Sequence, residues 1–130
     1  MASPGKGSQK KGADYERAIA NKLKLKFGVD VKRTGAQERW KSIGGDVNAP
    51  SYVDTILNRF QIECKKRESW AILNWFKKTQ DESGPQGRIP IVVASKNHEK
   101  DYLFMEFDDF IKILNELEGY IKQDVGVAGL

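Results

Sequence analysis

The sequence contains few of the side chains that thiol or imidazole chemistry requires. Among its 130 residues there is one cysteine, Cys64, and one histidine, His98. A single cysteine excludes an intrachain disulfide, and a histidine without a second histidine or cysteine does not form a zinc site. We therefore expect a reducing, cytoplasmic location for the chain and a chemistry that uses neither group.

Long apolar runs are also missing. No stretch approaches the roughly 20 apolar residues that a membrane span needs, and the N-terminal segment has no apolar region of the kind found in secretory signals. With 39% hydrophobic and 31% charged residues, the composition is typical of a soluble globular protein. A chain of this length has room for one core, so we expect a single domain and no membrane partner.

Charge is distributed unevenly along the chain. Residues 1–98 carry 19 Lys or Arg against 10 Asp or Glu, whereas residues 99–130 carry 3 against 8. A basic body with an acidic C-terminal end favours a partner that is a polyanion, such as a nucleic acid. Lysine-rich solubility would explain the same counts, so charge supports this hypothesis without establishing it.

Hydrophobic periodicity predicts one α/β domain over residues 13–118. A flexible basic arm is expected at residues 1–12 and a loose tail at residues 119–130. The predicted order is α-β-β-β-α-β-β-α, a mixed β-sheet flanked by helices. The helices are expected at 13–27, at 68–82 and from Asp108 or Asp109 onward; the strands are expected at 29–34, 46–49, 59–66, 91–95 and 102–107.

The amphipathic helices are expected to turn their apolar residues towards the core. In the last helix these residues are Phe110, Ile113, Leu114 and Leu117. The helix at 68–82 has an inward stripe of Ile72, Trp75, Phe76 and Thr79, with Trp70 outside it. Its apolar residues could pack in the core or form a dimer interface, and both interpretations remain open.

Two acidic residues occupy unusual positions. Glu16 lies in the apolar stripe of the first helix. If its carboxylate is buried there, it must be paired, neutralised or bound to a cation; alternatively it remains solvated at the start of the helix. Asp46 begins a strand after two glycines, where aspartate is a poor strand former although it is a good turn residue. Either position alone has an ordinary structural explanation.

The strand at 59–66 adds a carboxylate and an amine. Glu63 and Lys65 are two residues apart, so they project from the same face, opposite Ile62 and Cys64. This spacing alone would also suit a solvated ion pair. Together, Glu16, Asp46, Glu63 and Lys65 suit a Mg²⁺ site that hydrolyses phosphodiesters, because oxygen ligands select hard cations and a lysine can orient the attacking water.

These residues resemble a known nuclease pattern. Asp46, sixteen intervening residues and Glu63-Cys64-Lys65 resemble the PD-(D/E)XK nuclease superfamily, which has a restriction-endonuclease-like fold. Glu16 in the segment KGADYERAIANKL, Arg33 on the next strand and the run GGDVNAP make the chain similar to the archaeal-type Holliday junction resolvases. One departure is that Gly45, and not proline, precedes Asp46.

The resemblance implies a homodimer that binds four-way DNA junctions and nicks two opposed strands. Asp46, Glu63 and the Cys64 carbonyl would bind Mg²⁺, with Mn²⁺ as a substitute, and Glu16 would bind it directly or through water. Lys65 would position or activate the nucleophile. Arg17 and Arg33 would hold phosphates, and Ser42 would correspond to a serine of the family.

Other residues are candidates for contact with DNA. Lys10 and Lys11 in the arm can contact phosphates without sequence preference. Lys66 and Arg67 are expected to contact phosphates or to form part of a solvated surface. Trp40 could stack on a base, wedge a junction or simply anchor a loop.

Three alternatives remain on the sequence alone. The same catalytic core could belong to a mismatch or nicking nuclease or to a restriction-type enzyme, because substrate choice depends on loops and dimer geometry. The chain could also be a non-catalytic nucleic-acid-binding module whose acidic residues are structural.

Overall fold

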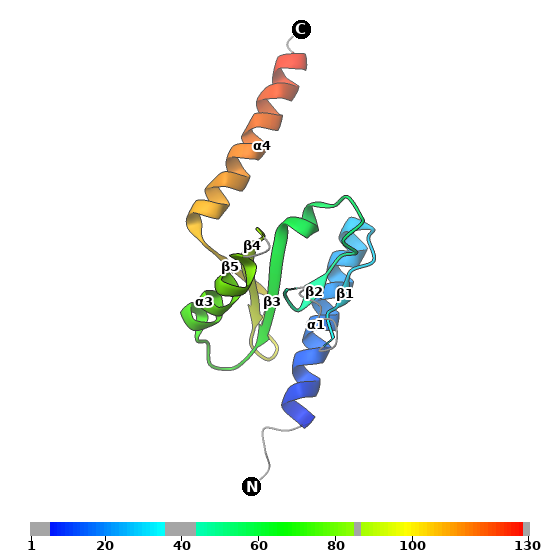
Figure 1. Ribbon diagram of the computed structural model, residues 1–130, viewed down its shortest axis with the longest axis vertical. Helices are drawn as coiled ribbons and strands as arrows, with labels where there is room; N and C mark the ends of the chain where they lie inside the picture. Colours follow the sequence, from blue (N-terminus) through cyan, green and yellow to red (C-terminus); the bar gives the residue numbers. More distant parts are fainter. Residues whose placement is uncertain (1–5, 36–43, 85–86, 129–130) are drawn as a thin grey trace.

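The computed structural model describes residues 6–35, 44–84 and 87–128. Figure 1 shows the order of its elements, which confirms the predicted order and the α/β class. The elements are α1 (Lys6–Phe27), β1 (Lys32–Arg33), β2 (Val47–Asn48), the 3-10 helix η1 (Ile56–Arg59), β3 (Phe60–Lys66), α3 (Ile72–Ser83), β4 (Ile89–Ser95), β5 (Tyr102–Met105) and α4 (Phe107–Ala128).

The five strands form one mixed sheet in the order β1-β2-β3-β4-β5. Strands β3 and β4 are parallel, and every other neighbouring pair is antiparallel. Helix α3 connects the two parallel strands, as a crossover must. The sheet therefore has β3 at its centre, with β2, which directly follows Asp46, on one side and the apolar strand β4 on the other.

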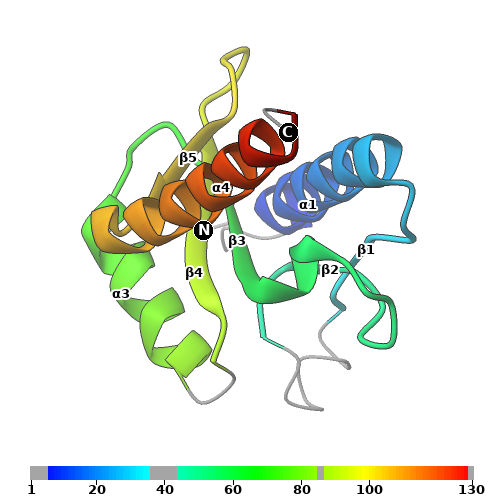
Figure 2. The same cartoon turned by 90° about the horizontal axis from the view of Figure 1, so that it is seen from above.

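Helices α1 and α3 cover opposite faces of this sheet. Tyr15 and Ile19 of α1 pack in the core with Ile62 and Cys64 of β3. Gln61, which points to the other face, is fully buried and donates its amide to Glu82 of α3. Figure 2 shows the two helices on either side of β3 and β4. Because helices cover both faces of the sheet, polar side chains of β3 such as Gln61 and Glu63 lie in the interior of the domain or at its edge.

The connection between β2 and β3 is ordered by short-range hydrogen bonds. Thr55 caps η1, its side chain accepting the backbone N–H of Leu57. The Asn58 side-chain amide donates to the carbonyls of Pro50 and Val53. These contacts hold the loop against the start of β3 and fix where that strand begins.

Two expectations about the chain ends are corrected by the structure. Residues 6–12 of the expected arm and residues 119–128 of the expected tail are helical. Ion pairs one turn apart support both extensions, between Lys10 and Asp14 and between Glu118 and Lys122. Composition indicated too little apolar surface for folding there, but a helix that has already formed extends at small cost per residue.

The helix expected at 68–82 begins later, at Ile72. Trp70 precedes it and packs edge-on against Tyr102 and Phe104 of β5, while its indole N–H donates to the carbonyl of Arg67. Trp70 therefore anchors the connection between β3 and α3. Within α3 the inward position is confirmed for Thr79, which is buried.

Helix α4 differs most from expectation. It stands away from the sheet, as Figure 1 shows. Phe110, Leu114 and Leu117, predicted to face inward, are exposed, and only Ile113 of that set is partly buried. The apolar period predicts that a face will be buried, but it does not identify the surface that buries it. No helix in the part of the chain that the structure describes is long and apolar enough to cross a bilayer.

Candidate active site

Asp46 is bonded to β3 on both sides of Glu63. Its backbone N–H donates to the carbonyl of Ile62 at 2.7 Å, and its carboxylate Oδ2 accepts the backbone N–H of Cys64 at 2.8 Å. The residue is 2% exposed. A buried carboxylate is stable only when hydrogen bonds or charges compensate it, and the Cys64 amide supplies one of them. Asp46 is therefore held in a fixed position beside the backbone of Glu63.

Two glycines allow this close approach. Gly45 has φ +86°, and a Cβ there would lie 3.0 Å from the carbonyl oxygen of Ile62. A Cβ on Gly44 would clash with the side chain of Gln61. Proline, with φ fixed near about −65°, cannot adopt the conformation of Gly45. The glycine in place of the superfamily's proline is thus required by the backbone of this chain.

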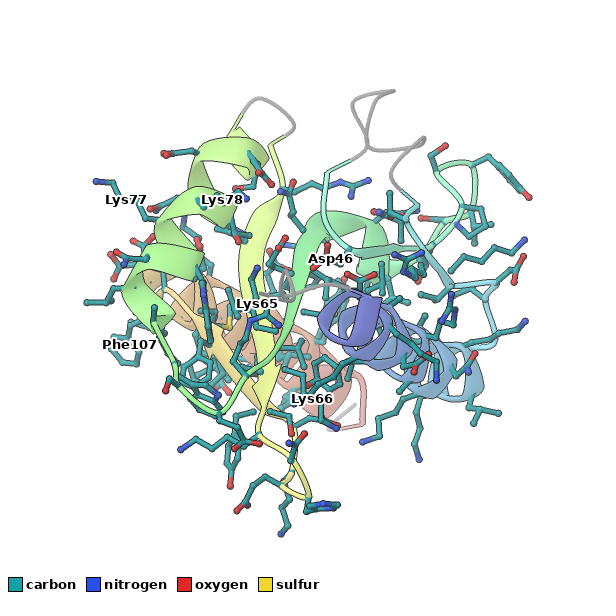
Figure 3. All side chains as sticks on the ribbon, turned by 90° about the horizontal axis from the view of Figure 1, so that it is seen from below. Asp46, Lys65, Lys66, Lys77, Lys78 and Phe107 are labelled. Atoms are coloured by element: carbon teal, nitrogen blue, oxygen red, sulfur yellow. The ribbon has the colours of Figure 1, made fainter. Side chains whose placement is uncertain are left out.

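Glu63 and Lys65 share one face of β3, as the alternation predicted. The Lys65 Nζ lies 3.7 Å from Oε1 of Glu63, and the two side chains are 13% and 22% exposed. Figure 3 shows Asp46 and Lys65 beside β3, in the region between α1 and α3. The arrangement brings a partly buried amine next to the carboxylate of Glu63.

Glu16 is paired with Arg33, which is one of the outcomes its position on the apolar stripe allowed. The Arg33 Nε donates to Oε2 of Glu16 at 2.6 Å, and the Glu16 side chain is only 12% exposed. This ion pair joins α1 to β1. In the described ranges, no three Asp, Glu, His or Cys side chains come close enough together to hold a metal ion. Glu16 therefore does not complete a three-carboxylate cluster with Asp46 and Glu63.

The donors that remain still suit a divalent cation. Asp46 and Glu63 offer carboxylate oxygens from neighbouring strands, and Mg²⁺ is commonly bound through one or two carboxylates while it retains several waters. Backbone carbonyls and water, rather than a third acidic side chain, would complete the coordination. The residues present thus fit a hard, hydrated cation.

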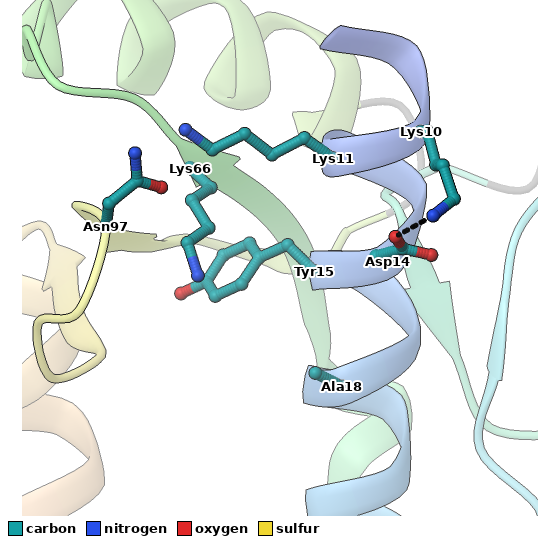
Figure 4. A pocket seen from close by; sticks show the side chains of 7 residues that line it. All are labelled: Lys10, Lys11, Asp14, Tyr15, Ala18, Lys66 and Asn97. Atoms are coloured by element: carbon teal, nitrogen blue, oxygen red, sulfur yellow. Dashed lines mark ion pairs between the residues drawn. The ribbon is translucent and has the colours of Figure 1, made fainter. Parts of the chain in front are cut away.

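Lysines gather beside this region around an open cavity of about 480 Å³. Figure 4 shows Lys10 and Lys11 of α1 on one side and Lys66 at the end of β3 on the other. The lining residues are Lys10, Lys11, Asp14, Tyr15, Ala18, Lys66 and Asn97. Because Lys66 follows Lys65 on β3, this basic cavity adjoins β3 on the face opposite Glu63 and Lys65.

Tyr15 supports the wall of that cavity. The Lys66 Nζ lies 5.5 Å from the centre of the Tyr15 ring, within the range of a cation–π contact. The Tyr15 hydroxyl donates to Oδ1 of Asp101 at 2.8 Å. Burial, followed by the hydrogen bond to Asp101, raises the pKa of Tyr15, so the phenol remains neutral. Tyr15 thus ties α1 to the connection between β4 and β5.

Of the remaining predicted residues, two have partners elsewhere on the surface and two are outside the described ranges. Arg17 is exposed and pairs with Asp14, and Arg67 is exposed at the end of β3, donating to the carbonyl of Lys66. Trp40 and Ser42 lie outside the described residues. The structure therefore holds Asp46 against the β3 backbone that carries Glu63 and Lys65.

One polar pair near Asp46 escaped sequence reasoning. Arg88 Nη1 donates to Oδ1 of Asn48 at 2.7 Å, and Asn48 also donates to the Thr34 hydroxyl and to the Gly44 carbonyl. Partial burial lowers the pKa of Arg88. Asn48 follows Asp46 by two residues, so alternation along the strand predicts that the two side chains share a face. The partner of Asn48 could not be predicted, because Arg88 lies 40 positions away, directly before β4.

Comparison with known proteins identifies a nuclease family for the chain. A family model described as "Phage putative PDDEXK endonuclease" matches residues 7–128. No curated protein and no solved structure matches the chain. The matched family lies in the predicted PD-(D/E)XK superfamily but is distinct from the archaeal-type resolvases, so the coarser part of the resemblance is confirmed. The match spans nearly the whole chain, and the protein belongs to this family of PD-(D/E)XK endonucleases.

Proposed function

We propose that the protein is a Mg²⁺-dependent endodeoxyribonuclease whose active site is formed by Asp46, Glu63 and Lys65. The observation that carries the proposal is the position of Asp46, which is buried and held on either side of Glu63: its backbone N–H donates to the Ile62 carbonyl and its carboxylate accepts the Cys64 N–H. A purely structural aspartate would not require an acid and a lysine on the adjoining strand. Here both are present, and they lie within 3.7 Å of each other.

The residues divide the work of phosphodiester hydrolysis. Asp46, Glu63 and the carbonyl of Cys64 would hold the cation, which supplies Lewis-acid stabilisation of the negative charge on the phosphate when it is bound. Lys65 would orient the attacking water and offset charge that develops on the scissile phosphate. Hydrolysis adds the water oxygen to phosphorus and leaves a proton on the departing sugar oxygen.

Glu16 and Arg33 would act from the edge of the site. Their ion pair fixes α1 against β1, and Arg33 keeps enough exposure to meet a phosphate. If Glu16 contributes to the cation, it does so through water, because the described side chains form no three-acid cluster. The pair would therefore hold DNA and support the site.

The basic cavity would bind the DNA backbone beside the site, since Lys66 directly follows Lys65 on β3. Lys10, Lys11 and Lys66 surround it, and exposed lysines bind phosphates without reading sequence. Affinity should therefore fall steeply as the salt concentration rises. Lys77 and Lys78, exposed on α3 on the far side of Lys65 in Figure 3, would extend the contact.

We propose a branched substrate, the four-way junction, which a homodimer would cut by paired symmetric nicks during DNA recombination or repair. The resemblance to junction resolvases, carried by Glu16, Arg33 and the run GGDVNAP, supports this choice. Mismatch or nicking nucleases remain the closest alternatives, followed by a non-catalytic binding module.

The test is an assay of the purified protein with Mg²⁺ or Mn²⁺ on a synthetic four-way junction, beside a linear duplex of the same sequence. We expect two nicked duplexes from the junction and little cleavage of the linear DNA. Equal activity on both substrates would contradict junction selectivity. Tight, salt-sensitive binding without cleavage of any DNA would favour the binding module.

The Asp46→Asn variant is the matched control for catalysis. Its amide oxygen can still accept the Cys64 N–H, so the fold should persist while the cation is lost. Wild-type cleavage in this variant would contradict the assigned site. Unchanged cleavage after chelation of divalent cations would contradict the metal dependence.

A further inference from the structure

Helix α4 exposes a continuous stripe of large apolar side chains. Each is between 42% and 70% exposed: Phe107, Phe110, Ile111, Leu114, Leu117, Tyr120 and Ile121. Five of them, at positions 107, 110, 114, 117 and 121, follow the alternating three- and four-residue spacing of a heptad seam. Scattered surface leucines are ordinary, but a periodic seam on one helix indicates an interface.

The stripe is presented by a helix with a fixed position. Arg59, at the end of η1, makes a bidentate ion pair with Glu116, with N–O distances of 2.7 and 2.9 Å. The pair tethers the middle of α4 to the body of the domain, while the helix extends away from the sheet (Figure 1). A preorganised helix loses little conformational entropy when its face is covered.

The charge of this region argues against nucleic acid as the partner. Residues 99–130 carry 3 basic and 8 acidic side chains, and Asp108 and Asp109 form the first turn of α4. An acidic surface repels phosphates. The basic residues proposed to bind DNA lie on α1, β1, β3 and α3 and not on α4, so the stripe is free to serve a different partner.

We propose that the α4 stripe binds the α4 stripe of a second copy of this chain in an antiparallel pair. With the two-fold axis between Leu114 and Leu117, Leu114 meets the partner's Leu117 and Phe110 meets the partner's Ile121. The antiparallel sense brings the acidic first turn, Asp108 and Asp109, towards the partner's Lys122. A parallel pair would instead place the two acidic first turns side by side.

The area of the stripe is sufficient for a stable dimer. Seven large side chains that each present on the order of 100 Å² approach the roughly 800 Å² per partner of a standard interface. The same area exceeds the largest apolar patch of a typical monomer, about 300–600 Å². Since Asp108 and Asp109 face the partner's Lys122 in the antiparallel sense, a two-fold dimer would cover the stripe with no further component.

Its consequence for DNA cleavage rests on the proposed function. Two catalytic domains joined through α4 would hold two Asp46–Glu63–Lys65 sites in a fixed relation, which paired nicks require. The pairing itself depends only on α4 and can be measured without DNA or metal.

The experiment is sedimentation equilibrium of the full chain over about 1–100 μM. We expect a dimer for the wild type. The double variant Leu114→Asp/Leu117→Asp should be monomeric, with the dissociation constant raised at least about 100-fold. The matched control is Leu73→Asp, an equally drastic change at an exposed leucine of α3, and it should leave the dimer intact.

The charged positions test the sense of the pairing. Asp108→Lys and Lys122→Glu should each weaken the dimer, and a mixture of the two variants should form a heterodimer more tightly than either self-associates. A wild-type monomer throughout the concentration range, or equal disruption by Leu73→Asp, would overturn the proposal. A monomeric Leu114→Asp/Leu117→Asp variant that still makes single nicks would leave the active site supported, so the two proposals can fail separately.

Discussion

The carboxylate of Asp46 accepts the backbone N–H of Cys64 at 2.8 Å, which gives this residue a structural bond as well as its proposed role in binding the cation. The two roles use different properties of the side chain. The hydrogen bond requires an acceptor oxygen, whereas the cation requires a negative charge. Substitutions at this position can therefore separate stability from catalysis.

Asp46→Asn should retain stability and lose activity. The asparagine oxygen can replace Oδ2 as the acceptor, so the free energy of unfolding should change little. Asp46→Ala leaves the Cys64 N–H without this acceptor, at a cost of about 1–3 kcal/mol. Both variants should lose at least about 100-fold in cleavage rate. Urea unfolding and junction cleavage measure the two effects, and equal destabilisation by Asn and Ala would contradict the assigned hydrogen bond.

Gly45→Ala should misplace Asp46. The positive φ and the Cβ contact 3.0 Å from the Ile62 oxygen strain the backbone by roughly 1–3 kcal/mol. A shift of about 1 Å at the carboxylate would lower cleavage about 100-fold. Gly12→Ala is the control, because nothing lies within 4 Å of the added Cβ and alanine favours a helix. A fully active and stable Gly45→Ala protein would show that the turn is not constrained.

Lys65 and Lys66 should separate catalysis from DNA binding. Lys65→Ala removes the amine beside Glu63, so kcat should fall by about 100-fold with little change in KM. Lys66→Ala removes a charge from the basic cavity, so KM should rise and the slope of log affinity against log salt should shrink by about one. Steady-state kinetics at several salt concentrations measure both. Identical kinetic defects would mean that the two lysines share one role.

The central strands could be predicted from sequence because their signal is local. Alternation placed Glu63 and Lys65 on one face of β3, and two glycines marked the turn before Asp46. The pairing of Glu16 with Arg33 was only one of several outcomes that sequence allowed. Arg88 and Asn48 could not be matched, since their contact depends on how β1 and β2 lie relative to β4.

Helix α4 shows the other limit of sequence reasoning. Its apolar period was recognised, but the expectation that this face packs inward was wrong. A period of 3.6 residues in the apolar positions indicates that one face of the helix will be buried. It does not indicate whether the surface that covers this face belongs to the same chain. The sequence also failed to predict that α1 begins before residue 13 and that α4 continues past residue 118. Adding a residue to a helical turn that has already formed costs little, so the extent of a helix depends less on local composition.

The ion pair between Glu16 and Arg33 should be worth about 1–2 kcal/mol of coupling. The Glu16 side chain is largely buried, so removing Arg33 takes a charge partner away from a carboxylate that is poorly solvated. A double-mutant cycle of Glu16→Gln and Arg33→Ala, in which the free energy of unfolding in urea is measured for each variant, gives the coupling energy of the pair. Additive effects would show that the pair does not stabilise the contact between α1 and β1.

Tyr15→Phe should change the stability of the protein in a pH-dependent way. The variant loses the hydrogen bond to Asp101, which costs about 1–2 kcal/mol near neutral pH. Burial raises the pKa of Tyr15 in the folded state above its ordinary value near 10, so the folded protein keeps this proton at a pH where the unfolded chain releases it. The contribution of the neutral phenol is thus complete below about pH 10 and is lost as the pH rises further. The wild type should exceed Tyr15→Phe in stability at pH 8, and the difference should narrow by pH 11.

Tyr52→Phe, at an exposed position, serves as the control and should follow the wild type at both pH values. A constant difference between wild type and Tyr15→Phe from pH 8 to 11 would show that the phenol is not protected by burial.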